Sequence, residues 1–394
     1  MARGNEHFRE LDREYIFPVV ERKLKDLTAS HPDADIINLG VGDIALPLAP
    51  SVAGAICKAT EEMTSSIIGY GPVEGYAFLR KAICEDEYSA LGITAEEIFI
   101  SDGANSDTTN IADLFSATSS VAITDPTYPA YLDTNILAGK KSQIVFLPCL
   151  EENHFIPKPP SGPCDYLYLC SPSNPTGVAM TTHDLSAFVA YAREHKSLIL
   201  YDNAYAAFIT SKNVPQSIYE VPGAKEVAIE FRSFSKSAGF TGLRCAYAVI
   251  PKTVFIGLGK QTISAHSLWM KRQNIKFNGV SYPIQRGAEA TFFPKGKEET
   301  TAQVQSYLAQ ASLLKEGLTQ MGFSCFGGTD SPYIWCKTPD GLSSWQFFDR
   351  LLHTCHLITI PGNGFGRCGE GYIRLSAFTT KEKATSAIER IQKL

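Results

Sequence analysis

The middle of the chain repeats one pattern, in which a short run of apolar residues ends in polar or glycine-rich residues. Helical stretches such as MTTHDLSAFVAYAREH separate some of these runs. Apolar strands that alternate with helices are typical of an α/β fold with a mostly parallel sheet. In such sheets ligands bind beyond the carboxyl ends of the strands, so polar residues there become candidate site residues. The predicted strands are 98–101, 121–124, 143–148, 165–170, 197–202, 227–235 and 245–250.

The segments on either side of this region predict additions to the sheet. Residues 1–40 are charged and amphipathic, and they predict an arm or a short helix outside any core. Residues 50–92 predict two helices around a glycine-rich loop, and residues 282–320 predict a long helical region broken near Pro294. The tail alternates strand-like and helical patterns, which indicates a second, smaller α/β domain. We therefore expect an N-terminal arm with part of the small domain (1–45), a large domain (46–283) and a small C-terminal domain (284–394).

The bulk composition narrows the class of protein. The chain has 394 residues, 44% of them apolar, and a net charge of -5, which gives it no general attraction to nucleic acid or anionic membranes. The N-terminus shows no apolar signal segment, and no run approaches the length needed to span a bilayer. The ten cysteines are scattered without CxxC pairs or metal-binding spacing. We expect them to be buried in a reducing compartment, and we expect a cytoplasmic protein without a metal.

The segment SFSKSAGFTGLR, residues 233–244, carries the strongest chemical signal. Ser233, Ser235 and Lys236 follow a predicted strand, and Arg244 comes eight residues after the lysine. A lysine amine can form an imine with an aldehyde, while hydroxyls and a guanidinium can hold a phosphate. The segment therefore predicts a site for a phosphorylated aldehyde. The alternative is a surface lysine in a Ser/Gly loop.

Two other strand ends carry polar side chains that suit a nitrogen-containing aromatic cofactor. The strand 197–202 ends at Asp202, with Tyr205 three residues later, and the turn CSPSNPTG contains Asn174. A buried carboxylate needs a cationic or hydrogen-bonding partner, such as a protonated pyridine nitrogen. The Asn174 amide could donate to a ring oxygen. A helix cap at Asp202 and an ordinary turn at Asn174 are the alternatives.

Four further positions are candidates. The backbone N–H groups of Ala104 and Asn105, at a predicted helix start, could bind an anion, although plain helix capping is the alternative. Tyr128 follows a strand and could stack on a flat cofactor, or it could be an ordinary core or surface tyrosine. Arg374 lies within the apolar strand YIRLSAF, where a guanidinium needs an anion. That anion is either a substrate carboxylate or the acid of a structural salt bridge.

The order of these motifs over nearly the whole chain resembles the fold-type I, class I/II aminotransferases, which use pyridoxal 5′-phosphate (PLP). The resemblance implies a seven-stranded, mostly parallel sheet between helices in the large domain. It implies that Lys236 carries PLP as an imine and shuttles protons, and that Asp202 pairs with the pyridine nitrogen. Tyr205, the third catalytic residue, contacts the ring oxygen. The other cofactor contacts that it implies are Asn174 at the ring oxygen, Tyr128 on the ring, and Ala104, Asn105, Ser233, Ser235 and Arg244 at the phosphate.

The N-terminal third resembles a narrower group, the LL-diaminopimelate aminotransferases. The similar segments include LDREYIFPVVERKLKDL, PDADIINLGVGDIALPL and SIIGYGPVEGYAFLRKAI, and NIKFNGVSYPIQRGAEA resembles them further along. The resemblance implies transfer of an amino group from LL-2,6-diaminopimelate to 2-oxoglutarate, in lysine and peptidoglycan-precursor synthesis. The products are glutamate and tetrahydrodipicolinate. It implies a homodimer with shared sites, in which Tyr70, also a cofactor contact, and Asn278 come from the other subunit. The implied substrate contacts are Tyr15, Gly42, Tyr70, Tyr128, Asn174, Asn278 and Arg374.

Two positions depart from the pattern of that group. It reads Glu-Gln-Gly where this chain has Val73-Glu74-Gly75, and it often has Lys where this chain has Asn105. The distal ammonium and carboxylate of the donor need polar partners, for which Glu74 is a candidate. Other reactions therefore stay open: transamination of an aromatic amino acid, alanine or aspartate, or a PLP-dependent lyase reaction. A non-catalytic PLP-binding regulator is disfavoured, because the chain has no basic helix-turn-helix extension.

Overall fold

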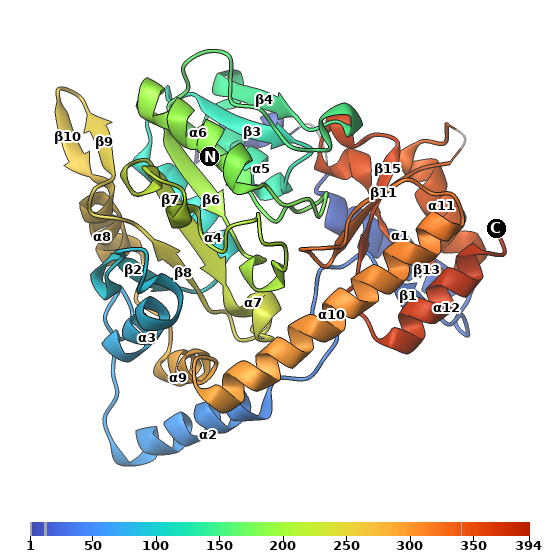
Figure 1. The fold of residues 1–394 in the computed structure, drawn as a ribbon, viewed down its shortest axis with the longest axis horizontal. Coiled ribbons are helices and arrows are strands. Elements are labelled where there is room, and N and C mark those ends of the chain that lie inside the picture. Colours follow the sequence, from blue (N-terminus) through green and yellow to red (C-terminus); the bar gives the residue numbers. More distant parts are fainter. Residues whose placement is uncertain (1, 12–13, 340) are drawn as a thin grey trace.

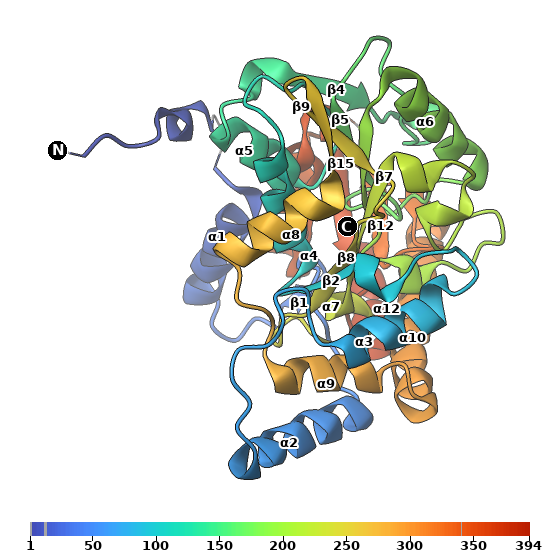
Figure 2. The same cartoon turned by 90° about the vertical axis from the view of Figure 1, so that its left-hand side faces the viewer.

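The computed structural model describes residues 2–11, 14–339 and 341–394. Figures 1 and 2 show a large sheet with helices on both faces and a smaller sheet with its own helices, which the long helix α10 links. The helices are α1 (Ile16–Ser30), α2 (Pro50–Ser65), α3 (Ala77–Ile83), α4 (Ala104–Asn110), α5 (Pro129–Leu137), α6 (Thr182–His195), α7 (Phe234–Ser237), α8 (Ala265–Lys276), α9 (Tyr282–Ala290), α10 (Pro294–Gln320), α11 (Ser344–Cys355) and α12 (Lys381–Ile391). The strands are β1 (Ile37–Asn38), β2 (Ile98–Ser101), β3 (Val121–Asp125), β4 (Ile144–Pro148), β5 (Tyr166–Cys170), β6 (Leu198–Asp202), β7 (Ala228–Ser233), β8 (Ala246–Val249), β9 (Phe255–Leu258), β10 (Gln261–Ser264), β11 (Cys325–Gly327), β12 (Tyr333–Lys337), β13 (Leu357–Ile358), β14 (Ile360–Pro361) and β15 (Tyr372–Ser376).

The large sheet has seven strands in the order β2-β8-β7-β6-β5-β3-β4. Strand β8 runs antiparallel to both of its neighbours, and the other neighbouring pairs are parallel. The central strands β5 and β6 are almost fully buried, because helices cover both faces of the sheet. The prediction of an α/β fold with a mostly parallel sheet is therefore confirmed, and each of the seven predicted strands lies in this sheet.

The strand directions bring the candidate residues to one edge. Strands β3, β5, β6 and β7 are parallel, so their carboxyl ends meet at the same edge. Strand β2 points the same way, because two antiparallel pairings separate it from β7. In register, Ala246 lies between Ser101 and Ser233, which places the start of α4 beside the segment that contains Lys236.

The smaller body contains a four-stranded antiparallel sheet in the order β11-β12-β15-β14. Helix α10 packs against α12, and α11 packs against β13, β14 and β15. In register, Arg374 lies opposite Trp335 on one side and Ile360 on the other. The domain boundaries at residues 45 and 283 stay a prediction.

One expectation for the N-terminus is wrong. The segment 16–39 contributes to the core, because Ile16, Val20 and Leu27 form one buried face of α1 that packs with β14 and α11. Strand β1 also pairs in parallel with β13, which ties the two ends of the chain together. The three- and four-residue spacing of these apolar positions is what gives the helix its buried face. Residues 2–10, by contrast, project past α5 as an arm (Figure 2).

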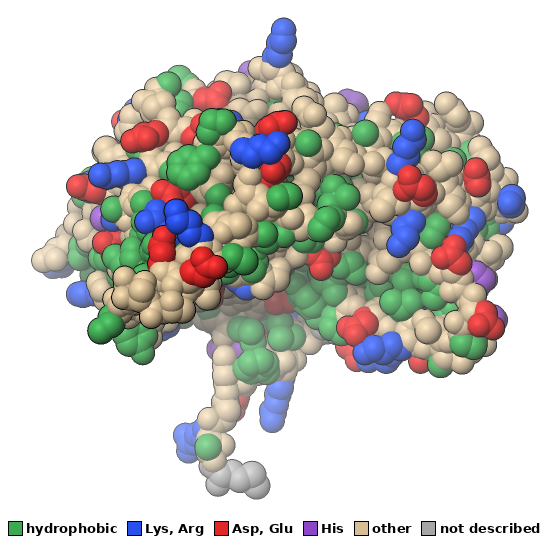
Figure 3. All heavy atoms as spheres, turned by 90° about the horizontal axis from the view of Figure 1, so that it is seen from below, with side chains coloured by type: hydrophobic (Ala, Val, Ile, Leu, Met, Phe, Trp, Pro, Cys, Tyr) green, Lys and Arg blue, Asp and Glu red, His purple; other side chains and the backbone are tan. Residues whose placement is uncertain are grey.

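The charge of the surface agrees with the composition, but the burial of the cysteines was predicted only in part. Figure 3 shows acidic and basic side chains interspersed on the face seen from below, as the modest net charge suggests. All ten cysteines are free, but Cys57 is exposed and four others are half-buried, so burial was predicted correctly for only five. No helix among the described residues combines the length and apolar character that crossing a bilayer requires.

Candidate active site

A cavity of about 340 Å³ lies at the carboxyl edge of the large sheet, where the smaller body meets it. This size suits a small organic ligand. The structure brings together in its lining thirteen of the fifteen residues that the sequence pointed to. They are Tyr15, Gly42, Ala104, Asn105, Tyr128, Asn174, Asp202, Tyr205, Ser233, Ser235, Lys236, Arg244 and Arg374.

Lys236 lies on α7, the short helix that follows β7. Its Nζ donates a hydrogen bond to the carbonyl oxygen of Gly42 and lies 5.6 Å from the centre of the Phe378 ring. Removal from water lowers the pKa of Lys236 to about 8, and the neighbouring guanidinium groups of Arg374 and Arg244 act in the same direction. At pH 7 roughly a tenth of this amine is therefore neutral and nucleophilic, far more than for an exposed lysine with a pKa of about 10.4. The surface-lysine alternative does not fit this position.

Asp202 ends β6 and is buried at the floor of the cavity. Its Oδ1 accepts a hydrogen bond from the Ala204 N–H (3.1 Å), and its Oδ2 accepts one from the Tyr131 hydroxyl (2.5 Å). The first bond is a local turn contact and not the helix cap named as the alternative, because the next helical turn, Ala206–Phe208, has Tyr205 as its N-cap. Neither partner is a cation, so burial raises the pKa of Asp202 to about 6. A cationic ligand group beside Asp202 would offset the cost of burying its ionised carboxylate.

Arg244 and the start of α4 form a cradle at one end of the cavity. A Cβ on Gly103, which has φ of +137°, would come within 2.1 Å of the Arg244 guanidinium. The backbone can therefore approach the guanidinium closely only because glycine stands there. Arg244 Nη1 also lies 3.4 Å from Ser235 Oγ, and Ser233 Oγ accepts the Ser235 N–H. Hydroxyls, a guanidinium and backbone N–H groups in one place suit a phosphate.

Arg374 also lines this cavity and is buried, 1% exposed. Its Nη1 donates to Asn174 Oδ1 and its Nη2 donates to the Gly40 carbonyl oxygen, both at 2.6 Å. Both partners are neutral, which argues against the structural salt bridge. Among the described residues the Nε atom has no hydrogen-bond partner. A buried guanidinium with neutral partners and an unfilled donor is suited to bind a carboxylate.

The tyrosines around the cavity form two hydrogen-bonded groups. Tyr128 donates to Asn105 Oδ1 (3.1 Å), and Tyr15 bonds to Tyr128. The hydroxyls of Tyr205 and Tyr333 lie 2.9 Å apart. Burial raises the pKa of both Tyr128 and Tyr205, so both are protonated donors at neutral pH.

Two predicted residues lie outside this cavity. Tyr70 is 92% exposed, and Asn278 is exposed just after α8. Their loops are neighbours, because a Cβ on Gly279 would lie 3.0 Å from the Pro72 carbonyl oxygen. Ile67 and Ile275, each three residues before one of these two positions, are exposed as well.

The sequence missed several residues that line the cavity. Tyr131 follows Tyr128 by three positions, a helical spacing that places both on one side of α5, and this spacing could have identified it. Tyr333 begins the apolar strand β12, and nothing in its local sequence indicates that its hydroxyl fills the space beside Gly42. Glu74, the candidate partner for a distal group, instead lies 3.7 Å from Arg80 and outside the lining of this cavity.

Comparison with known proteins identifies the family. Residues 34–391 match the family described as aminotransferase class I and II. The chain belongs to this family. The predicted class of enzyme, an aminotransferase, is thereby confirmed, as is the resemblance to the narrower group.

Individual aminotransferases of this family extend the match over the full chain. The LL-diaminopimelate aminotransferase of Parabacteroides distasonis is 47% identical over 406 aligned positions, covering 100% of this chain and 99% of the relative. The solved L,L-diaminopimelate aminotransferase of Chlamydomonas reinhardtii has a TM-score of 0.95 at 39% identity, covering 100% and 98%. An aromatic aminotransferase of Pyrococcus horikoshii has a TM-score of 0.81 at 26% identity, covering 95% and 98%.

Aminotransferases of this family generally use PLP, and the cavity fits that cofactor. The cradle of Gly103 and Arg244 suits its phosphate, and Asp202 suits its ring nitrogen. Lys236, whose amine could form the imine, lines the same cavity. The three features that PLP binding needs are therefore present together.

Proposed function

We propose that this aminotransferase transfers an amino group from LL-2,6-diaminopimelate to 2-oxoglutarate, with PLP as its cofactor. The products would be glutamate and a keto acid that cyclises to tetrahydrodipicolinate, a step in lysine and peptidoglycan-precursor synthesis. The observation that carries the proposal is the single cavity that holds Lys236, Asp202 and Arg374. The named donor is supported by the relatives from Parabacteroides distasonis and Chlamydomonas reinhardtii.

The lining residues divide by the part of PLP that they would hold. The phosphate would lie against Ser233, Ser235, Arg244 and the backbone of Ala104 and Asn105. Tyr128 would stack on the ring, Tyr205 and Asn174 would contact the ring oxygen, and Asp202 would pair with the ring nitrogen. When bound, PLP supplies an electron sink for the substrate carbon that loses its proton.

Lys236 would act as the cofactor's attachment point and as the general base. A lysine with a pKa of about 8 can take a proton from the substrate α-carbon and return it, because both of its forms are populated near neutral pH. Asp202 would keep the ring nitrogen protonated. Its burial favours a cationic partner, since such a partner replaces the water that the carboxylate has lost.

Arg374 would bind the α-carboxylate of the donor. The Asn174 amide oxygen holds the guanidinium in place, and the amide Nδ2 stays available as a donor. Tyr15 and Gly42 belong to the same cavity lining and would complete the substrate contacts.

Replacement of Arg374 by Lys is expected to raise the KM of amino donors roughly 10- to 100-fold. A single ammonium cannot reproduce the bidentate contact, and it would leave Asn174 or Gly40 without a donor. Steady-state kinetics with several donors measure the effect. Arg350→Lys, on the exposed side of α11, is the matched control. A KM within twofold of wild type would remove the assigned role.

The active enzyme would be a homodimer with shared sites. Tyr70 and Asn278 lie on adjoining loops with exposed Ile67 and Ile275, and a second copy could cover this apolar surface. Tyr70 and Asn278 would then enter the cavity of the other subunit.

A donor panel with 2-oxoglutarate tests the named substrate. Purified enzyme loaded with PLP is incubated with LL-diaminopimelate, meso-diaminopimelate, an aromatic amino acid, alanine and aspartate, and glutamate is measured. We expect LL-diaminopimelate to give the highest kcat/KM. If another donor gave glutamate and LL-diaminopimelate did not, the proposed substrate would be wrong. Release of ammonia or pyruvate without a keto-acid acceptor would indicate a lyase.

A further inference from the structure

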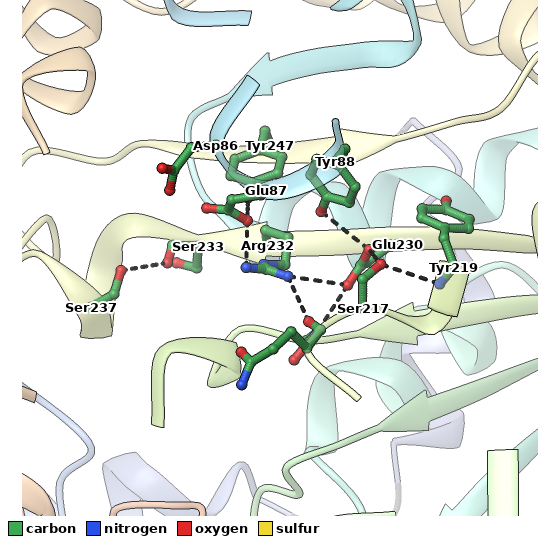
Figure 4. Close-up of polar contacts among 12 residues, drawn as sticks. Asp86, Glu87, Tyr88, Ser217, Tyr219, Glu230, Arg232, Ser233, Ser237 and Tyr247 are labelled. Carbon is green, nitrogen blue, oxygen red and sulfur yellow. Dashed lines mark hydrogen bonds and ion pairs between the residues drawn. The ribbon is translucent and has the colours of Figure 1, made fainter. Parts of the chain in front are cut away.

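A cluster of buried charges lies behind the active-site cavity, on the strand that leads to Lys236. Glu230 and Arg232 belong to β7, and Glu87 belongs to η2 (Cys84–Tyr88), a single turn of π-helix after α3. Arg232 Nη2 lies 2.5 Å from Glu87 Oε2, and Arg232 Nη1 lies 3.4 Å from Glu230 Oε1 (Figure 4). The Glu230, Arg232 and Glu87 side chains are 0%, 12% and 22% exposed, and all three lie outside the lining of the active-site cavity.

Glu230 is the centre of this cluster. Its Oε2 accepts hydrogen bonds from the hydroxyls of Ser217 (2.6 Å) and Tyr88 (3.1 Å). Its Oε1 accepts one from the Asn203 side-chain amide (2.8 Å) in addition to the contact with Arg232. Four donors from different parts of the chain therefore converge on one carboxylate, which satisfies the demand of a buried charge for partners.

The cluster connects the two strands that carry the reacting groups. Asn203 directly follows Asp202 at the end of β6, and Arg232 precedes the segment that contains Ser233, Ser235 and Lys236. Glu230 binds both Asn203 and Arg232. Both side chains also donate to the carbonyl oxygen of Gln216, at 2.8 and 2.9 Å.

Backbone pairing between β6 and β7 ends before Arg232, although β7 stays paired with β8 as far as Ser233. The β6–β7 register ends where Asp202 lies opposite Phe231, and one further backbone bond joins the Asn203 N–H to the Phe231 carbonyl oxygen. Beyond this bond the segment after β6 continues toward Tyr205, and the segment after β7 enters α7. A buried ion pair adds little net stability compared with apolar packing. We therefore look for its effect in the relative placement of the ends of β6 and β7.

We propose that Glu230 is a positioning residue for the aminotransferase reaction, which it serves by fixing the spacing of Asp202 and Lys236 through Asn203 and Arg232. The inference rests on the proposed function, in which Asp202 and Lys236 hold different atoms of one rigid cofactor ring. An error in their spacing would weaken both contacts at once. Glu230 itself touches neither substrate nor cofactor.

Two variants test this role. Glu230→Gln keeps the volume but removes one acceptor oxygen, and Asn203→Ala removes the tie to β6 while the Glu230, Arg232 and Glu87 charges stay. For both we expect the PLP dissociation constant to rise roughly tenfold, as measured by titration of cofactor-free protein. We also expect a shift in the pH dependence of the bound-cofactor absorbance, a lower kcat, and a donor KM within twofold of wild type.

Glu97→Gln is the matched control. Glu97 is also a buried carboxylate in the large body, and it accepts bonds from the Thr94 and Lys252 N–H groups at the β2 edge, away from Asp202. This variant should lower the melting temperature but keep the wild-type PLP dissociation constant and pH profile. If both cluster variants behaved in the same way as this control, the positioning role would be refuted. If Glu230→Gln failed to fold, Asn203→Ala would decide.

The same measurements separate this inference from the proposed substrate. PLP titration of cofactor-free protein needs no amino donor, so an enzyme specific for another amino acid would still show the tenfold change. A wild-type protein that failed to bind PLP would overturn the proposed function and the inference together.

Discussion

Replacement of Lys236 by Ala is expected to lower kcat for transamination by at least about 10³-fold, because it removes both the attachment point for the cofactor and the general base. The cavity itself should persist, since the Lys236 ammonium makes one hydrogen bond to a backbone carbonyl and no ion pair among the described residues. Glutamate formation measures the loss. The melting temperature and the far-ultraviolet circular dichroism check that the variant is folded.

Two controls sharpen this result. Lys252→Ala removes an exposed lysine that pairs with Glu96 outside the cavity lining, and it should keep wild-type kcat. A small primary amine such as ethylamine, added to Lys236→Ala, should restore part of the activity, because it can occupy the space of the missing side chain and accept the proton. Activity of Lys236→Ala within tenfold of wild type without added amine would refute both roles of this lysine.

Much of the site could be predicted because parallel strands place their carboxyl ends at one edge. Asp202, Asn174 and Tyr128 each follow a different strand, so the α/β pattern alone predicts that they converge. Lys236 follows a fourth such strand. Their convergence depends on strand direction, which the alternation of strands and helices determines, and not on details of packing.

Residues whose contribution depends on side-chain direction could not be predicted in this way. Tyr333 lies in the smaller sheet, and its approach to the cavity depends on how that sheet packs against the large one. Arg374, on the adjacent strand, was identified only because a guanidinium in an apolar strand needs an anion, and not from strand direction. Glu230 lies within an apolar run, and its strand pattern gives no sign of the four donors around it. The antiparallel hairpin of β9 and β10 was also missed, because its strands are four residues each and largely exposed, and so lack the buried apolar run that marks the strands of the large sheet.

The departures from the LL-diaminopimelate group concern the distal end of the donor. Asn105 accepts a hydrogen bond from Tyr128, so its side chain is already engaged within the cavity. Glu74 lies against Arg80 and outside the cavity lining of its own chain. The donor panel therefore tests the distal end of the donor, for which the lining of one chain offers few partners, whereas Arg374, the proposed partner of the α-carboxylate, belongs to that lining.

Replacement of Asp202 by Asn is expected to have opposite effects on stability and on catalysis. Burial raises the pKa of Asp202 to about 6 in the folded, cofactor-free protein, compared with an unfolded value of about 3.8. The folded state therefore binds more protons between these values, and its stability falls as the pH rises through that window. Above about pH 6 the ionised carboxylate costs roughly 3 kcal/mol of unfolding free energy. The substituted amide avoids this cost and can still accept the Ala204 N–H.

Urea unfolding of cofactor-free protein measures the first effect. At pH 7.5 the Asp202→Asn variant should be more stable than wild type by up to about 3 kcal/mol, and this difference should shrink as the pH falls from 6 toward 4. Its kcat with PLP should fall roughly 10²- to 10³-fold, because a neutral amide cannot keep the ring nitrogen protonated. Asp107→Asn is the matched control. Asp107 is another buried carboxyl whose pKa is raised by burial, but it bonds to Ser101 and lies outside the cavity lining.

We expect Asp107→Asn to gain stability in the same way while keeping kcat within a few fold of wild type. Burial raises the pKa of both carboxyl groups, and the two variants would then show whether the effect on kcat comes from the cationic ligand group proposed to meet Asp202. Equal losses of kcat in the two variants would mean that Asp202 acts through the fold and not through the cofactor. A loss of kcat confined to Asp202→Asn, together with a gain in the stability of the cofactor-free variant, would support the role of Asp202. The Asp202 carboxylate would then destabilise the protein without PLP, and PLP binding would offset that cost.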